Sequence, residues 1–209
     1  MAAALAGAAV GWFLASRLDD AYSAEILSER EKLPARGPAF AACLAISWAL
    51  AAIVAGDLRE FVLLALFMLP LVAVTLTDLE ARVIPNRIIY PSLVLALLLS
   101  WAWPDRGVAE SIIGAVAGFG FMLFPFLLSG GRGIAAGDVK LAGFMGAAAG
   151  WPAIIPGLLI GVLAGGVAAV AIGLRARSRS ASFAYGPYLA LGGAIALLFG
   201  EDIVDWYSG

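Results

Sequence analysis

The chain has 209 residues, of which 63% are hydrophobic and 13% are charged, and its mean hydropathy is +0.98. A soluble globular domain is about half apolar and about a quarter charged, so this composition excludes an ordinary soluble fold and indicates membrane-spanning helices. These residues include no histidine and one cysteine, Cys43, which excludes Ser-His-Asp and Cys-His proteases, HExxH zinc proteases and Cys/His zinc sites within them. The net charge of −2 is small, and we expect no nucleic-acid partner.

Eight apolar runs follow one another along the chain. They cover residues 2–16, 39–55, 61–76, 88–103, 111–128, 139–151, 153–174 and 184–200. Because a bilayer span needs about 20 mostly apolar residues, we expect an all-α, polytopic bundle of about eight transmembrane helices with short loops, forming one integral-membrane domain over residues 1–209. The first run lacks the features of a signal peptide, so we interpret it as a retained helix. The sixth run is too short to cross a bilayer unaided, so we expect it to start deep in the membrane, to tilt, or to lie where the protein interior is wet.

The basic residues are distributed unevenly between the loops. If the amino terminus lies outside, the inside loops hold all of the 13 Lys and Arg residues except Arg59 and Arg106, whereas the acids divide almost evenly. Cytoplasmic loops of membrane proteins carry this excess of basic residues. We therefore expect a multi-pass protein of the bacterial inner membrane with both termini outside and loop 17–38 in the cytoplasm. The same orientation places Asp78 and Asp138 together on the cytoplasmic side.

Two aspartates lie at the ends of apolar runs. Asp78 closes the third run and Asp138 opens the sixth. Helix capping accounts for either residue alone, but an ionisable group at membrane depth is costly and is a functional candidate. Two carboxylates that meet in a low-dielectric site share a proton, so one can act as a base on water while its protonated partner polarises a carbonyl group. This chemistry requires no metal, histidine or cysteine.

Motifs surround both aspartates. Residues 78–86 (DLEARVIPN) resemble the first aspartate motif of the type IV prepilin peptidase family, and residues 137–141 (GDVKL) resemble its second, the GxGD motif shared with presenilin-like proteases. Residues 185–192 (YGPYLALG) resemble the closing FGPxLxxG segment of that family. The resemblance implies a membrane-embedded aspartic endopeptidase that removes the leader peptide of type IV prepilins or pseudopilins at the cytoplasmic face. It assigns the catalytic roles to Asp78 and Asp138.

Other residues of these motifs are expected to support the pair. They are Pro85, Asn86, Gly137, Lys140, Gly186 and Pro187. Gly137 has no Cβ, so a second backbone or a substrate strand can come close to the aspartate. Pro85 sets a turn that ends one element and precedes the next span. Lys140 either favours ionisation of a nearby carboxylate or anchors its helix at the membrane interface.

The chain departs from the family pattern at two places. The GxGD motif has glycine where this chain has Ala135. Many members also carry paired CxxC motifs in the first cytoplasmic loop, which bind zinc and are linked to methylation of the new pilin amino terminus, whereas residues 17–38 contain no cysteine. We therefore expect peptidase activity that needs no cofactor and no metal, with S-adenosylmethionine as a cofactor only if methylation is retained.

The inside loops also carry acids that can attract a basic leader. We hypothesise that Glu29, Glu31 and Glu80 do so, and the alternative is that they are solvated loop charges. The expected partners are a prepilin or pseudopilin and the lipid bilayer. Two other functions remain open. One is a small proton- or cation-coupled transporter that uses the paired carboxylates, and the other is a non-catalytic assembly component.

Overall fold

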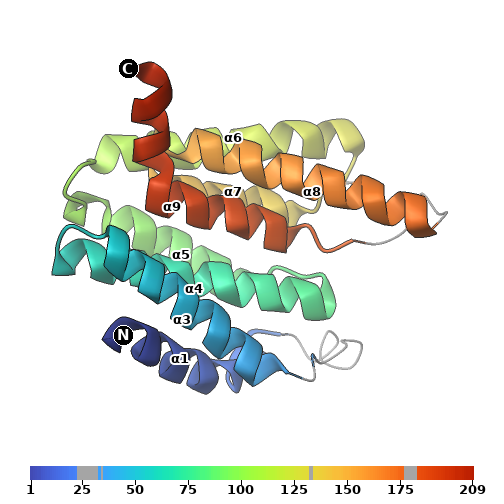
Figure 1. The fold of residues 1–209 in the computed structure, drawn as a ribbon. Coiled ribbons are helices and arrows are strands. Elements are labelled where there is room, and N and C mark those ends of the chain that lie inside the picture. The colour runs from blue at the N-terminus through green and yellow to red at the C-terminus, as the bar shows by residue number, and fades with distance from the viewer. Residues whose placement is uncertain (23–32, 34, 132–133, 177–182) are drawn as a thin grey trace.

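The computed structural model describes residues 1–22, 33, 35–131, 134–176 and 183–209, and in this part of the chain it contains helices and no strand. The elements are α1 (Ala2–Ala15), η1 (Leu18–Ala21), α3 (Arg36–Val54), α4 (Leu58–Ala81), α5 (Asn86–Leu98), η2 (Ser100–Ala102), α6 (Val108–Ser129), α7 (Ala136–Ala149), α8 (Ile154–Ala176) and α9 (Gly186–Ser208). Each predicted apolar run coincides with one α-helix, which confirms the all-α expectation. The helices lie side by side with both termini at one end of the bundle, whereas α4 ends and α7 and α9 begin at the other (Figure 1).

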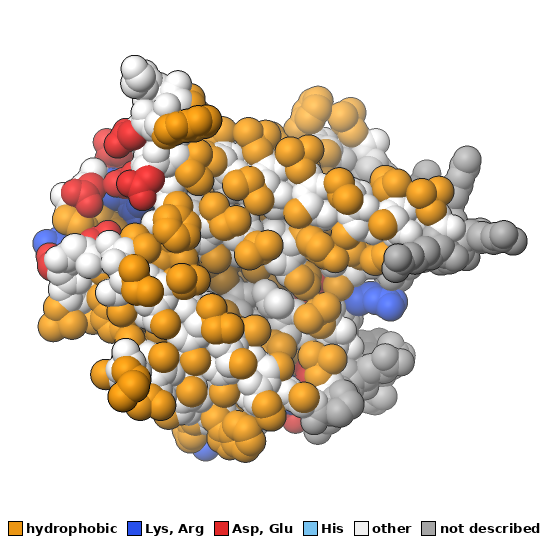
Figure 2. Space-filling view, viewed as in Figure 1, with side chains coloured by type: hydrophobic (Ala, Val, Ile, Leu, Met, Phe, Trp, Pro, Cys, Tyr) orange, Lys and Arg blue, Asp and Glu red, His pale blue; other side chains and the backbone are white. Residues whose placement is uncertain are grey.

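In the part of the chain that the structure describes, five helices are long and apolar enough to cross a membrane by length and composition. They are α3, α4, α6, α8 and α9, and α1 and α5 are shorter apolar helices. The outer surface suits lipid, because hydrophobic side chains cover most of the face shown in Figure 2. Large apolar side chains such as Phe124, Leu163 and Val167 are more than half exposed. A soluble protein of this size rarely exposes so much contiguous apolar surface.

The short helix α7 lies in the interior of the bundle. It packs against α5, α6 and α9, and every residue from Leu141 to Ala149 is buried. Small side chains allow this packing. A Cβ atom on Gly146 would lie only 1.9 Å from the carbonyl oxygen of Gly114 on α6, so glycine at this position permits the two backbones to touch. The interior position of α7 explains how a 14-residue helix is accommodated in the bundle.

Candidate active site

Asp78 lies in the last turn of α4. This helix begins with a capped turn, where the Asp57 carboxylate accepts a hydrogen bond from the Glu60 amide at 2.7 Å. It ends at Arg82, which adopts the left-handed conformation with φ of 53°. The helix continues five residues past the apolar run that ends at residue 76, so Asp78 is inside the helix and not in a loop. Its side chain is buried, with 5% exposure.

The amino terminus of α9 holds the Asp78 carboxylate. The backbone N–H of Gly186 donates a hydrogen bond to Oδ2 of Asp78 at 2.8 Å. The first amides of a helix have no partner within the helix, and its dipole favours a negative charge there. Gly186 is also the residue that fits, because a Cβ atom at this position would lie 2.9 Å from the same oxygen. Pro187 follows in the first turn of α9, where its missing N–H costs no helical hydrogen bond.

Asp138 is in the first turn of α7 and is also buried, with 4% exposure. Its Oδ2 accepts a hydrogen bond from the backbone N–H of Ala135, the N-cap residue, at 2.9 Å. This carboxylate therefore caps its own helix, as the simpler interpretation of the sequence held. Ala135 has φ of −84° and ψ of 154°, an extended conformation open to any L-residue. The backbone at this place thus has no need of the glycine that the family motif carries.

The two carboxylates lie close enough for the charge of Asp78 to act on Asp138. Tyr185, the residue before α9, is near the same pair. Burial, together with the charge of Asp138, raises the pKa of the Tyr185 hydroxyl to about 12, so this group stays protonated at neutral pH. Its hydroxyl donates to the carbonyl oxygen of Val162 on α8 at 3.4 Å. The structure therefore brings the ends of α4, α7 and α9 together around two acids and one phenol.

Each aspartate uses one oxygen, Oδ2, to accept a hydrogen bond from a backbone amide, which leaves its other oxygen for a reactant. Oδ1 of Asp78 and Oδ1 of Asp138 accept no hydrogen bond from the residues that the structure describes. These two oxygens are available to a water molecule or a substrate carbonyl. A carboxylate pair in this state can take a proton from water with one member and donate a hydrogen bond with the other.

The remaining motif residues fix α5 and α7 beside the pair. A Cβ atom on Gly137 would lie 2.9 Å from Cβ of Ile84, so this glycine lets the start of α7 approach the segment before α5. Pro85 is the buried N-cap residue of α5. The Lys140 ammonium donates a hydrogen bond to Oδ1 of Asn86 at 2.8 Å and lies 5.3 Å from the centre of the Tyr90 ring. Lys140 thus links α7 to α5 at the edge of the site.

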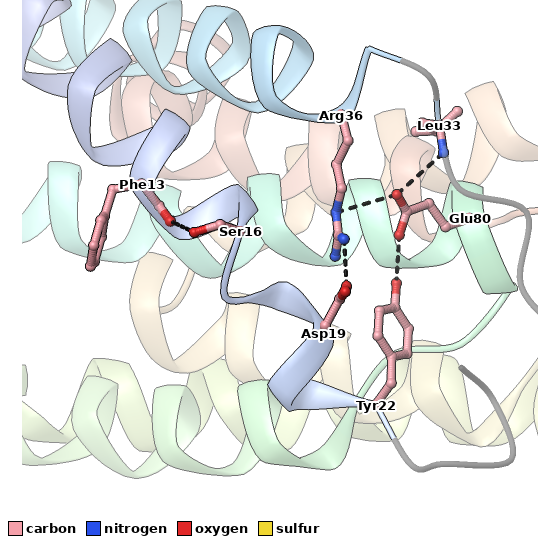
Figure 3. Close-up of polar contacts among 7 residues, drawn as sticks. All are labelled: Phe13, Ser16, Asp19, Tyr22, Leu33, Arg36 and Glu80. Atoms are coloured by element: carbon pink, nitrogen blue, oxygen red, sulfur yellow. Dashed lines mark hydrogen bonds and ion pairs between the residues drawn. The ribbon is translucent and has the colours of Figure 1, made fainter. Parts of the chain in front are cut away.

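The predicted leader-binding acids have different positions. Glu29 and Glu31 lie outside the described residues. Glu80 is in α4 and its side chain is fully buried. It accepts hydrogen bonds from the Tyr22 hydroxyl at 3.1 Å and from the Leu33 amide at 3.4 Å, and it pairs with Arg36 at 3.3 Å (Figure 3). We call Tyr22, Arg36 and Glu80, together with Asp19 on Arg36, the Glu80 cluster.

Sequence reasoning missed two features of this region. The sequence motif of residues 185–192 does not by itself assign a role to Tyr185, although its position directly before Gly186 is a signal for one. Tyr22 and Arg36 were not connected with Glu80, because their hydrogen bond and ion pair span 58 and 44 positions in the chain and follow no local pattern. Among the described residues, no group of three or more Cys, Asp or Glu side chains is arranged to hold a metal ion.

Comparison with known proteins identifies relatives of this chain. It is 36% identical over 142 residues to the prepilin leader peptidase/N-methyltransferase of Aeromonas salmonicida (strain A449), an alignment that covers 66% of this chain and 49% of the relative. It is 34% identical over 150 residues to the protein of the same name from Pseudomonas putida, covering 66% and 51%. The chain thus spans about half the length of the curated relatives it matches. No solved structure matches it.

A family model gives the same result. The model of the type IV leader peptidase family matches residues 63–170. That region is more than half of the chain and contains both Asp78 and Asp138. The chain therefore belongs to the type IV leader peptidase family.

Proposed function

We propose that this protein is a membrane-embedded aspartic endopeptidase that removes the leader peptide of type IV prepilins or pseudopilins at the cytoplasmic face. The observation that carries the proposal is that two buried aspartates, Asp78 in the last turn of α4 and Asp138 in the first turn of α7, lie at the same end of the bundle (Figure 1), each with one oxygen held by a backbone amide. Family membership supports it, and so do the printed names of the relatives. Those names also include N-methyltransferase, and the proposal concerns cleavage alone.

The proposed reaction uses the two carboxylates in different protonation states. The ionised aspartate removes a proton from a water molecule, and the protonated aspartate donates a hydrogen bond to the oxygen of the scissile carbonyl group. The water oxygen bonds to the carbonyl carbon, the C–N bond breaks, and the leaving nitrogen takes up a proton. Two neighbouring acids in a buried site favour this shared-proton state because they do not ionise together easily.

The position of the acids within their helices favours a peptidase over a transporter. Asp78 is in the last turn of α4 and Asp138 is in the first turn of α7, so both lie at one end of the bundle. Transporters more often bind their ions near the bilayer midplane, at broken helices between repeats. A pair at the membrane edge is instead accessible to a peptide that leaves the bilayer there.

The test is co-expression of the protein with a prepilin, followed by mass measurement of the pilin. Asp78→Asn and Asp138→Asn are each expected to reduce leader removal by about 10²- to 10⁴-fold, the usual contribution of an acid–base group. Asp202→Asn is the matched control, since this exposed aspartate lies in α9 near its carboxyl end. Normal cleavage by either site variant would contradict the two-aspartate mechanism. Equal loss in the control would point to a folding defect.

A further inference from the structure

A groove lies between the first helices and the rest of the bundle. Residues of the α1–η1 segment, α3, α4 and α5 line it, and it encloses about 320 Å³. Its lining is mostly apolar and includes Phe40, Leu66, Ala73, Ile88 and Leu95. This volume is at the lower end of the range for sites that bind small ligands. An apolar groove in a protein with a lipid-facing surface is suited to a hydrocarbon chain.

Two arginines line the same groove. Arg17 lies between α1 and η1, and Arg87 is the second residue of α5. A guanidinium N–H of Arg87 donates to the carbonyl oxygen of Asp20 at 2.9 Å, and the guanidinium carbon of Arg17 lies 5.8 Å from the centre of the Phe13 ring. Neither arginine forms an ion pair with any residue that the structure describes. Both positive charges are therefore available to an anion.

The arginines occupy a level where lipid headgroups lie. Arg17 comes two residues after the end of α1, and Arg87 is one residue inside α5, so both are at helix ends. The ends of membrane helices lie in the headgroup region of a bilayer. A ligand that fills the groove and also reaches the arginines must have an apolar chain joined to an anionic head.

We propose that this groove binds an anionic phospholipid, with an acyl chain against α4 and α5 and its phosphate between Arg17 and Arg87. Basic pockets between transmembrane helices bind anionic headgroups, and guanidinium groups form charge-assisted hydrogen bonds with phosphate. The same two charges repel a basic peptide, so charge favours a lipid over a prepilin leader in this groove. The inference does not depend on the proposed peptidase activity.

A lipid bound in the groove would stabilise the fold without reaching the two aspartates. On α4, the groove is lined by Leu69, Pro70 and Ala73, which lie between one and three turns before Asp78. Asp78 itself is outside the groove and accepts a hydrogen bond from Gly186 of α9. A lipid here would fill the space between the α1–α3 pair and α5 without touching the carboxylates. Because it would bind the folded protein and not the unfolded chain, it would raise thermal stability by mass action.

The test is lipid titration of the full chain in detergent, with bound lipids counted by native mass spectrometry. Dioleoylphosphatidylglycerol is the anionic probe, and dioleoylphosphatidylcholine is the zwitterionic probe with the same chains. The unaltered protein should retain the anionic lipid in preference and gain thermal stability from it. The double variant Arg17→Gln/Arg87→Gln should bind the anionic lipid about thirtyfold more weakly, given the usual contribution of each basic residue.

A matched control and a second variant keep the test decisive. Arg59→Gln removes an exposed arginine that lies on Trp101 away from the groove, and it should bind the anionic lipid normally. Ala73→Leu narrows the groove without changing charge and should reduce retention of both lipids. Equal binding of both lipids by the unaltered protein, or unchanged binding by the double arginine variant, would overturn the proposal. If native mass spectrometry instead detected protein dimers without bound lipid, the groove would be a contact between two copies of the protein.

Discussion

The backbone N–H of Gly186 donates a hydrogen bond to Oδ2 of Asp78 at 2.8 Å, although 108 positions separate the two residues in the chain. This contact brings the first turn of α9 against the last turn of α4. It predicts that Gly186→Ala displaces the carboxylate, because the new Cβ atom would lie 2.9 Å from the accepting oxygen. Leader cleavage should fall by about 10²-fold, the effect of a misplacement of about 1 Å in a catalytic group. The measurement is the rate of pilin processing in membranes.

A second glycine-to-alanine change is the control for this prediction. A Cβ atom on Gly166, in α8, would meet no atom within 4 Å. Gly166→Ala should therefore process pilin at the normal rate, and alanine should raise helix stability slightly. If Gly186→Ala also cleaved at the normal rate, the contact between Gly186 and Asp78 would have no part in the reaction.

The two residues on either side of the α7 start should respond differently to substitution. Ala135→Gly should leave cleavage nearly unchanged, since Ala135 already has the extended backbone that the N-cap needs, and stability should change by less than about 1 kcal/mol. Gly137→Ala should impair cleavage, because its Cβ would collide with Ile84 at 2.9 Å. Both variants can be compared in one processing assay. A large gain from Ala135→Gly would show that alanine at this position limits the proposed cleavage.

The Glu80 cluster should contribute to stability more than to chemistry. Glu80→Gln removes the carboxylate charge beside Arg36, which keeps Asp19 as a partner, so we expect a cost of about 1.5–3 kcal/mol, that of a hydrogen bond to a charged group. Tyr22→Phe removes one hydrogen bond to a charged group and should cost about 1.5–3 kcal/mol. Thermal unfolding in detergent measures both, and the double variant should cost less than the sum because the two residues share a contact. Additive losses would show that the Tyr22 hydroxyl binds the Glu80 carboxylate no more strongly than it binds the glutamine carbonyl.

Arg106 should stabilise the far end of α7. Its guanidinium donates to the carbonyl oxygens of Ala148 and Ala149 at 2.7 and 2.6 Å and stacks on Trp103 at 3.5 Å. Burial lowers its pKa to about 10, so it remains charged at neutral pH. Arg106→Met should cost about 1.5–3 kcal/mol for each hydrogen bond lost. The exposed Arg59 is the control in the same unfolding measurement, since Arg59→Met should cost much less.

Hydropathy located the helices well because each span must be apolar over most of its length. It failed at the end of α4, where the helix continues to Ala81 through two charged residues, Asp78 and Glu80. Residues two apart on a helix do not share a face, so Asp78 faces α9 while Glu80 faces the segment around Arg36. The sequence shows two acids in the last turn of α4, but it does not show that Gly186 is the partner of one and Arg36 the partner of the other.

The candidate site was predictable in its residue types but not in its contacts. The two aspartates are recognisable from their motifs and their place at the ends of apolar runs. The amide of Gly186 and the packing of Gly137 on Ile84 depend on which helices are neighbours in space. Composition and hydropathy carry little information on helix neighbours, since all the helices are similarly apolar.

The contact between Gly186 and Asp78 also has a consequence for truncation. The match to the family model ends at residue 170, inside α8 and before α9 begins. A fragment cut at that boundary would retain both aspartates and most of the recognisable motif sequence. It would lose the Gly186 amide, which donates a hydrogen bond to Asp78, and it would lose α9, which packs against α7. The smallest unit with an intact site therefore includes α9, and domain boundaries for expression should be placed after that helix.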